Sequence, residues 1–217
     1  MSNLIEIKIV LVDDHKLLRD GLRNIIEQRS NMQIIGEASD GREAIKVASK
    51  LVPNVIVMDV AMPGLNGIEA AKQIHKIEPD IKIIGLSMHS GKQFIQGMFK
   101  AGAFGYLLKD GDSDELLTAI STVMENKRYL SKDINQDYLN QLKKGESIEK
   151  AQLSSREKEV LQLIAEGKSS KEIGEVLFLS PKTIDVHRNN IMKKIELHTI
   201  PDLTKYAIQK GLTSLDL

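Results

Sequence analysis

Residues 55–67 read Val-Ile-Val-Met-Asp-Val-Ala-Met-Pro-Gly-Leu-Asn-Gly. The stretch begins with an uninterrupted apolar run that is rich in β-branched residues, a pattern typical of a strand buried on both faces of a parallel sheet. The run ends at Asp59, and Pro63 and Gly64 then favour a turn. We therefore expect a buried strand at Val55–Asp59 that carries a carboxylate at its C-terminal end.

The same pattern recurs on both sides of this strand, where short β-branched runs alternate with longer segments of helical period. The predicted strands are Lys8–Val12, Gln33–Glu37, Val55–Asp59, Lys82–Ser87 and Gly105–Leu108. The predicted helices are Leu17–Arg29, Arg42–Leu51, Ile68–Ile77, Lys92–Ala101 and Asp114–Lys127. This alternation predicts an α/β fold, a (βα)5 doubly wound parallel sheet. Ligands of such sheets bind beyond the C-terminal strand ends.

The second part of the chain has a different character. Polar residues dominate from Tyr129 to Gln152, which indicates a linker. Beyond it the strand pattern is absent and helix-start signals appear: Ser154 and Ser169 each begin a sequence with capping-box spacing, and Ser180 precedes a proline. The predicted organisation is an α/β domain at 1–128, a linker at 129–152 and a small all-α domain of four helices at 153–217.

The composition excludes several classes of protein. Lys and Arg number 30 and Asp and Glu number 30 in 217 residues, so any DNA-binding surface must come from local clustering of charge. The absence of cysteine excludes disulfides and cysteine metal sites and fits a reducing compartment. No apolar run is long enough to span a bilayer, and the N-terminus does not have the pattern of a signal peptide. We expect a cytoplasmic protein without a membrane partner.

Acidic side chains are expected to converge at one edge of the predicted sheet. Asp13 and Asp14 follow the first strand and Asp59 ends the third. Crowded carboxylates repel one another unless a cation lies among them, and their hard oxygen atoms favour Mg²⁺. Ser87 and Lys109, at the ends of the fourth and fifth strands, add a hydroxyl and an ammonium group suited to phosphate oxygens. Together these groups indicate phosphoryl transfer, in which one carboxylate attacks phosphorus.

Each of these side chains taken alone also fits a structural role. An Asp-Asp pair after a strand is commonly a turn or a helix cap. Ser87 alone would be a satisfied polar residue, Tyr106 a packed aromatic and Lys109 a solvated charge. The joint placement of the acids, the hydroxyl and the ammonium group at four strand ends favours the site.

The first domain resembles the receiver domain of bacterial response regulators. The residues that carry the resemblance are Asp13-Asp14, Asp59, Met62-Pro63-Gly64, Gly67, Ser87 and Lys109. The resemblance implies that Asp59 accepts a phosphoryl group from a sensor histidine kinase. It implies Mg²⁺ ligands in Asp14, Asp59, the Ala61 carbonyl and, through water, Asp13. It also implies that Ser87 and Lys109 hold phosphoryl oxygens, and that the Tyr106 ring moves inward as Ser87 is drawn to the phosphate, a two-state switch.

The second domain resembles the LuxR-type helix-turn-helix of the NarL/FixJ regulators. The residues that carry the resemblance are Leu153–Glu157, Glu166–Ser169, Lys171–Ile173 and Ser180–Arg188. We predict a scaffold helix at Ser170–Leu177, a turn at Phe178-Leu179 and a recognition helix at Pro181–Ile195 that enters the major groove of double-stranded DNA. By resemblance, the final helix, Asp202–Lys210, also forms a dimer contact.

Polar side chains gather on one side of the predicted recognition helix, with basic ones in excess. We predict phosphate contacts from Lys182, Arg188 and Lys193, and base-edge contacts from Asp185 and Asn189, with Thr183 on the same side. Many relatives have lysine at the position of Asp185, so its role in base recognition is open. Lysine and arginine on a helix face can also be merely solvated.

These features predict a phosphorylation-dependent transcriptional regulator that binds promoter DNA and forms a homodimer when phosphorylated. One alternative is a phosphatase with an aspartyl-phosphate intermediate. Such enzymes need a second acid two residues after the nucleophile, where this chain has Ala61, so we expect no enzyme beyond slow self-dephosphorylation. A second alternative is an interaction module whose helices bind protein or RNA.

Overall fold

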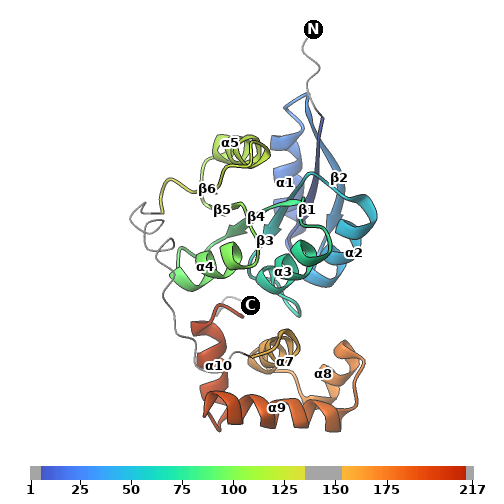
Figure 1. Ribbon diagram of the computed structural model, residues 1–217, viewed down its shortest axis with the longest axis vertical. Coiled ribbons are helices and arrows are strands. Elements are labelled where there is room, and N and C mark those ends of the chain that lie inside the picture. Colours follow the sequence, from blue (N-terminus) through green and yellow to red (C-terminus); the bar gives the residue numbers. More distant parts are fainter. Residues whose placement is uncertain (1–5, 135–152, 214–217) are drawn as a thin grey trace.

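The computed structural model describes residues 6–134 and 153–213, which form two domains (Figure 1). The first domain contains a parallel sheet of six strands in the order β2-β1-β3-β4-β5-β6. The strands are β1 (Ile7–Val12), β2 (Met32–Ala38), β3 (Val55–Asp59), β4 (Lys82–Ser87), β5 (Gly105–Leu108) and β6 (Tyr129–Leu130). The strand order reverses between β1 and β3, so the C-terminal ends of these two strands flank the expected ligand position.

Helices cover both faces of the sheet, as the alternating pattern predicts. The helices are α1 (Lys16–Ile26), α2 (Gly41–Leu51), α3 (Gly67–Ile77), α4 (Lys92–Lys100) and α5 (Ser113–Met124). One hydrophobic core joins the sheet to α2, α3 and α4, and a second joins its other face to α1 and α5 (Figure 1). All five residues of β3 are buried, which confirms the prediction made from its apolar run. The doubly wound α/β fold is therefore confirmed.

Residues 129–134, which were predicted to begin the linker, belong to the first domain instead. They form β6, which extends the sheet beside β5. Ser131 Oγ donates a hydrogen bond of 2.9 Å to the Glu115 carboxylate, and Ile134 is buried in the core. Two residues are too few to show the apolar alternation by which a strand is recognised in a sequence. The pairing of β6 with β5 uses backbone groups, which every residue type except proline provides in full. The rest of the predicted linker, 135–152, lies outside the described residues.

The second domain is all-α, as predicted. Its helices are α7 (Ser155–Ala165), α8 (Ser170–Leu177), α9 (Pro181–Ile195) and α10 (Ile200–Gln209). Both capping boxes are present, and the Ser180 side chain caps α9. Ile184 and Ile191 of α9 are buried, whereas Val186 is 52% exposed. The final helix begins at Ile200, two residues earlier than predicted, because Thr199 serves as its cap.

None of the helices in the two described segments is long and apolar enough to cross a membrane.

Glu157 makes the stability of the second domain dependent on pH. Its buried carboxylate closes the first capping box with Ser154 and accepts a hydrogen bond of 2.8 Å from Lys194 Nζ. Burial raises the pKa of Glu157, but the bonds from Lys194 and Ser154 together outweigh it, so the pKa falls below its ordinary value of 4.5. A lowered pKa stabilises the folded state above the ordinary value, and this contribution is lost as pH falls through the folded-state pKa.

We therefore expect Glu157→Gln to destabilise the protein at pH 7 by about 1 to 3 kcal/mol, since a buried charge-assisted network loses the charge of its acceptor. The difference from the wild type should shrink as pH falls below the ordinary carboxyl pKa. Urea unfolding of the full chain across this pH range measures it. Glu175→Gln on the exposed side of α8 is the matched control and should leave stability unchanged. A difference that is independent of pH would contradict the proposed charge effect.

Candidate functional site

The predicted site residues meet at the C-terminal edge of the sheet. Asp13 directly follows β1, Asp59 ends β3, Ser87 ends β4 and Lys109 directly follows β5. Parallel pairing aligns these strand ends, and the Lys109 backbone N–H continues the ladder by donating to Ser87 O at 2.9 Å. The side chains of Asp13, Asp59 and Ser87 are almost completely buried.

Lys109 joins two of the carboxylates. Its Nζ lies 2.8 Å from Asp59 Oδ2 and 2.7 Å from Asp13 Oδ2. The other Asp59 oxygen, Oδ1, accepts a hydrogen bond of 3.1 Å from the Ala61 backbone N–H. One ammonium group from β5 therefore bridges acids that come from β1 and β3.

Burial and charge act in opposition on these groups. Burial raises the pKa of Asp59 and the Asp13 charge adds to this, while Lys109 pulls it down; the net shift is upward. Burial lowers the pKa of Lys109, but the attraction of Asp59 and Asp13 outweighs it and the pKa is raised. The site thus contains more negative charge than one lysine compensates, which favours binding of a cation.

His15 is a member of the cluster that the sequence reasoning missed. Its Nδ1 lies 2.9 Å from Asp14 Oδ1 and 3.1 Å from Asp13 Oδ1, while its ring is largely exposed. Its position next to the Asp-Asp pair was the available signal. Adjacency alone did not indicate that the ring would turn back toward both acids.

The donor set fits a hard divalent cation. Ligand atoms of Asp13, Asp14, His15 and Asp59 lie within 4.8 Å of one another. Asp13 Oδ2 and Asp14 Oδ1 are buried and accept no well-oriented hydrogen bond, although Lys109 and His15 lie at ion-pair distance from them. Oxygen atoms in this condition suit Mg²⁺, which accepts carboxylate ligands and keeps several waters.

Close backbone packing shapes the loop after β3. A Cβ on Gly67 would lie 2.1 Å from the Asp59 carbonyl oxygen, so only glycine fits at the start of α3. Gly64 has a φ of +79°, which favours glycine in the turn. The two glycines of the motif therefore bring this loop against the strand that carries Asp59.

The two predicted switch residues meet on one backbone segment. Ser87 Oγ accepts a hydrogen bond of 3.1 Å from the His89 N–H, and Tyr106 OH donates one of 2.7 Å to the His89 carbonyl. The Tyr106 ring is completely buried. The His89 ring stacks on Phe94 of α4 with 4.7 Å between centroids. Movement of Ser87 would therefore reach Tyr106 and α4 through His89.

The predicted DNA-contacting residues differ in their surroundings. Lys182, Asn189 and Lys193 are exposed on α9. The Thr183 N–H donates to the Ser180 cap at 3.1 Å, so Thr183 belongs to the start of the helix. Lys194, another basic residue of α9, binds Glu157 of α7 at 2.8 Å.

Asp185 and Arg188 of α9 interact with each other. Arg188 Nη2 lies 3.1 Å from Asp185 Oδ1, and Ser170 Oγ of α8 donates to the same oxygen at 2.7 Å. The helix itself lies on the far side of α7 from the first domain (Figure 1). The first domain therefore leaves the exposed face of α9 uncovered.

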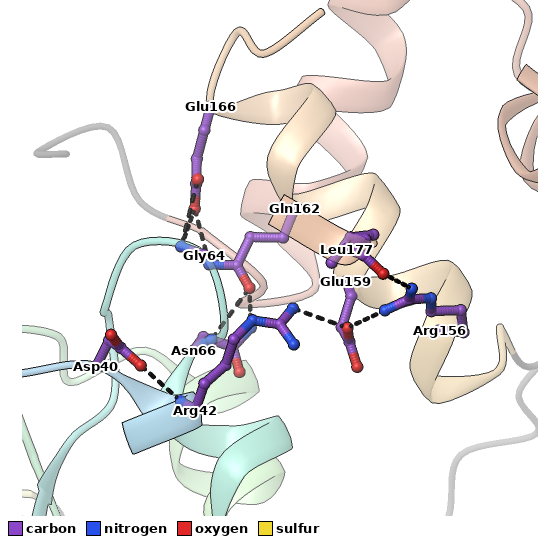
Figure 2. A network of polar contacts seen from close by, with 9 residues as sticks. All are labelled: Asp40, Arg42, Gly64, Asn66, Arg156, Glu159, Gln162, Glu166 and Leu177. Atoms are coloured by element: carbon purple, nitrogen blue, oxygen red, sulfur yellow. Dashed lines mark hydrogen bonds and ion pairs between the residues drawn. The ribbon is translucent and has the colours of Figure 1, made fainter. Parts of the chain in front are cut away.

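A buried polar contact joins the two domains at the loop after β3 (Figure 2). Gln162 of α7 donates from Nε2 to Met62 O at 2.9 Å, and its Oε1 accepts from the Asn66 N–H at 3.1 Å and from Asn66 Nδ2 at 3.0 Å. Asn66 Nδ2 also donates to Leu212 O at 3.0 Å. Gln162 and Asn66 are each 1% exposed, so this amide pair is the buried centre of the domain interface.

Charged groups surround this amide pair. Glu166 accepts from the Gly64 N–H at 3.2 Å, and Arg42 of α2 lies 3.0 Å from Glu159 of α7 (Figure 2). Lys158 lies 3.1 Å from the buried carboxylate of Glu69. The second domain is therefore held by the same loop that follows the Asp59 strand.

Two family models match the chain. Residues 9–121 match the response regulator receiver domain, and residues 151–207 match the bacterial regulatory proteins of the luxR family.

Individual relatives match over almost the whole length. The response regulator UvrY of Escherichia coli K12 is 37% identical over 212 residues, which is 97% of each chain. Among solved structures, RcsB of Salmonella enterica serovar Typhimurium bound to promoter P1flhDC with the phosphomimetic BeF3− is similar with a TM-score of 0.60 and 27% identity, covering 96% of this chain and 100% of that one. A structure of two RcsB dimers bound to two parallel DNAs gives a TM-score of 0.57 and 27% identity, with 94% and 98% covered.

Proposed function

The chain belongs to the NarL/FixJ family of response regulators and is a transcriptional regulator with a receiver domain and a LuxR-type DNA-binding domain. From this premise we propose that a sensor histidine kinase phosphorylates Asp59, and that phosphorylation controls binding of α9 to promoter DNA. The observation that carries the proposal is that three acids, a hydroxyl and an ammonium group converge at one edge of the sheet: Asp13, Asp14, Asp59, Ser87 and Lys109. The loop that follows Asp59 at this edge also contacts the second domain.

The transfer step follows from the geometry of the acids. A carboxylate oxygen of Asp59 attacks the phosphorus of a phosphohistidine, the P–N bond breaks, and the departing imidazole takes up a proton from solvent. Lys109, already 2.8 Å from Asp59 Oδ2, then neutralises a phosphoryl oxygen. Ser87 uses its Oγ to accept from His89, so its own proton is available to another phosphoryl oxygen. Asp14, Asp59 and the Ala61 carbonyl, with Asp13 through water, would hold Mg²⁺, which would supply further charge neutralisation when bound.

We expect the phosphorylated state to persist rather than to turn over external substrates. Hydrolysis requires water to attack phosphorus while the Asp59 carboxylate leaves. Ala61, two residues after Asp59, has no side-chain acid or base to assist that attack. The chain is accordingly proposed to be a switch with slow self-dephosphorylation and not an enzyme.

The domain interface supplies a route from the phosphoryl group to the DNA-binding domain. Met62 and Asn66 contact α7, Gly64 contacts its C-cap Glu166, and the three lie three to seven residues after Asp59. The second route runs from Ser87 through His89 to Phe94, which lies against Gly211 next to the end of α10. If phosphorylation moves the segment after Asp59 or the segment from Ser87 to His89, the docking of the second domain would change.

DNA binding is proposed to involve a homodimer. RcsB is described as dimers bound to DNA, and a dimer of this chain would place two α9 helices on successive half-sites. Linking two weak contacts in this way raises affinity without any new contact.

The proposal is tested by measuring duplex affinity with and without phosphorylation. Full-length protein is treated with acetyl phosphate and Mg²⁺, and binding to duplexes selected from a random library is followed by fluorescence anisotropy. We expect phosphorylation to raise affinity about 5- to 150-fold, the usual range of coupling between two sites. Equal affinity in both states would overturn the coupling. Absence of salt-dependent duplex binding would instead favour the alternative of a protein- or RNA-binding module.

A further inference from the structure

Asp185 is restrained by two helices at once. Its Oδ1 accepts from Ser170 Oγ, at the start of α8, at 2.7 Å and lies 3.1 Å from Arg188 Nη2, one turn further along α9. An exposed ion pair between residues three apart on a helix is weak when neither side chain is otherwise held. The Ser170 contact fixes the acid, so the pair restrains the guanidinium of Arg188.

This arrangement bears on what Arg188 recognises. A phosphate contact needs only positive charge, and an acid beside it would repel the phosphate. Reading guanine needs two parallel N–H groups in one plane, which Arg provides and Lys does not. The ion pair of 3.1 Å between Nη2 and Asp185 Oδ1 holds the guanidinium beside the acid and leaves its other N–H groups for a base edge. The surroundings of Arg188 therefore suit a base contact better than the phosphate contact expected from the sequence.

Lys182 and Lys193 differ from Arg188 in this respect. Both are exposed on α9, and no acid of the described residues forms an ion pair with either of them. They keep the properties of phosphate contacts. Among the predicted DNA contacts of α9, Lys182 and Lys193 therefore differ from Arg188, which is held in an ion pair with Asp185.

We propose that Arg188 reads a guanine in the major groove and that Asp185, fixed by Ser170, is the residue that positions it. The proposal rests on the proposed DNA-binding function. It assigns Asp185 to specificity rather than to affinity, because the acid orients a neighbouring side chain and adds no favourable contact with the DNA backbone.

The test is selection of bound sites from a random duplex library by the full-length, acetyl-phosphate-treated protein. The wild type should select a site with a guanine whose replacement weakens binding about 5- to 150-fold, as for a bidentate arginine contact. Arg188→Lys keeps the charge and should lose this preference. Asp185→Ala and Ser170→Ala should weaken the preference at the same position. Thermal unfolding checks that each variant is folded.

Lys193→Ala is the matched control. It should weaken binding to all sequences alike and reduce the salt slope by about one unit, without changing base preference.

Three outcomes would overturn the assignment. If Arg188→Lys retained the full preference, Arg188 would be a phosphate contact. If Asp185→Ala relaxed a different position from Arg188→Lys, Asp185 would read a base itself. If the wild type bound duplexes in a salt-dependent way but selected no common site, the specificity role would fail while DNA binding stood. Only the absence of all duplex binding would overturn the proposed function as well.

Discussion

Asp59→Asn is expected to abolish phosphorylation of the protein. The amide nitrogen is not nucleophilic, and the remaining amide oxygen cannot form a stable acyl phosphate. Asp13 and Asp14 stay in the site but are engaged by Lys109 and His15. Incubation with acetyl phosphate and Mg²⁺, followed by intact-mass measurement, should show one added phosphoryl group in the wild type and none in the variant.

Asp20→Asn is the control for this experiment. Asp20 is an exposed residue of α1 outside the acid cluster, so the variant should be phosphorylated as fully as the wild type. The added group in the wild type should be lost on brief treatment with base, as an acyl phosphate is. If Asp59→Asn still gained a base-labile phosphoryl group, another carboxylate would be the acceptor and the assignment would be wrong.

The acid cluster could be predicted because it depends on strand ends alone. Once β1, β3, β4 and β5 are recognised as parallel strands, the residues that follow them must share one edge of the sheet. No knowledge of side-chain conformation was needed to predict that these residues meet: Asp13, Asp59, Ser87 and Lys109. His15 could not be placed in this way, because the direction of its ring depends on the loop and not on the sheet.

Contacts between the two parts of the chain were not accessible to the same reasoning. Gln162 lies in the middle of an amphipathic helix, where a polar residue is ordinarily interpreted as solvent-facing. It is 1% exposed because its amide meets Asn66, which is remote in sequence. Similarly, the spacing of Asp185 and Arg188 allows an ion pair, but the Ser170 bond that restrains it depends on how α8 packs against α9. Local patterns determine elements and their ends, whereas these contacts depend on how elements pack.

Gln162→Ala is expected to weaken docking of the second domain against the receiver without phosphorylation. The substitution removes the partners of Met62 O and of the Asn66 N–H, and weakens the bonding of Asn66 Nδ2. Leaving buried polar groups unpaired costs about 1 to 3 kcal/mol each, and about 2 kcal/mol corresponds to a shift of roughly 30-fold in the docking equilibrium. The fold of each domain should be retained, because, among the described residues, Glu166 is the one hydrogen-bond partner of this side chain that lies within the second domain.

Domain separation measures the effect. The chain contains no cysteine, so Lys50→Cys and Glu175→Cys, both at exposed positions, give one labelling site in each domain for energy transfer between two dyes. Gln162→Ala should lower transfer efficiency. If the loop after Asp59 transmits the signal, acetyl phosphate should also lower transfer efficiency in the labelled protein that retains Gln162. Gln33→Ala, the same substitution at an exposed position of β2, should change neither value.

Unchanged transfer in Gln162→Ala would mean that the amide pair does not hold the domains together. A phosphorylation response that persisted undiminished in that variant would place the coupling on the route through His89 and Phe94, because the loop contact it requires would already be absent.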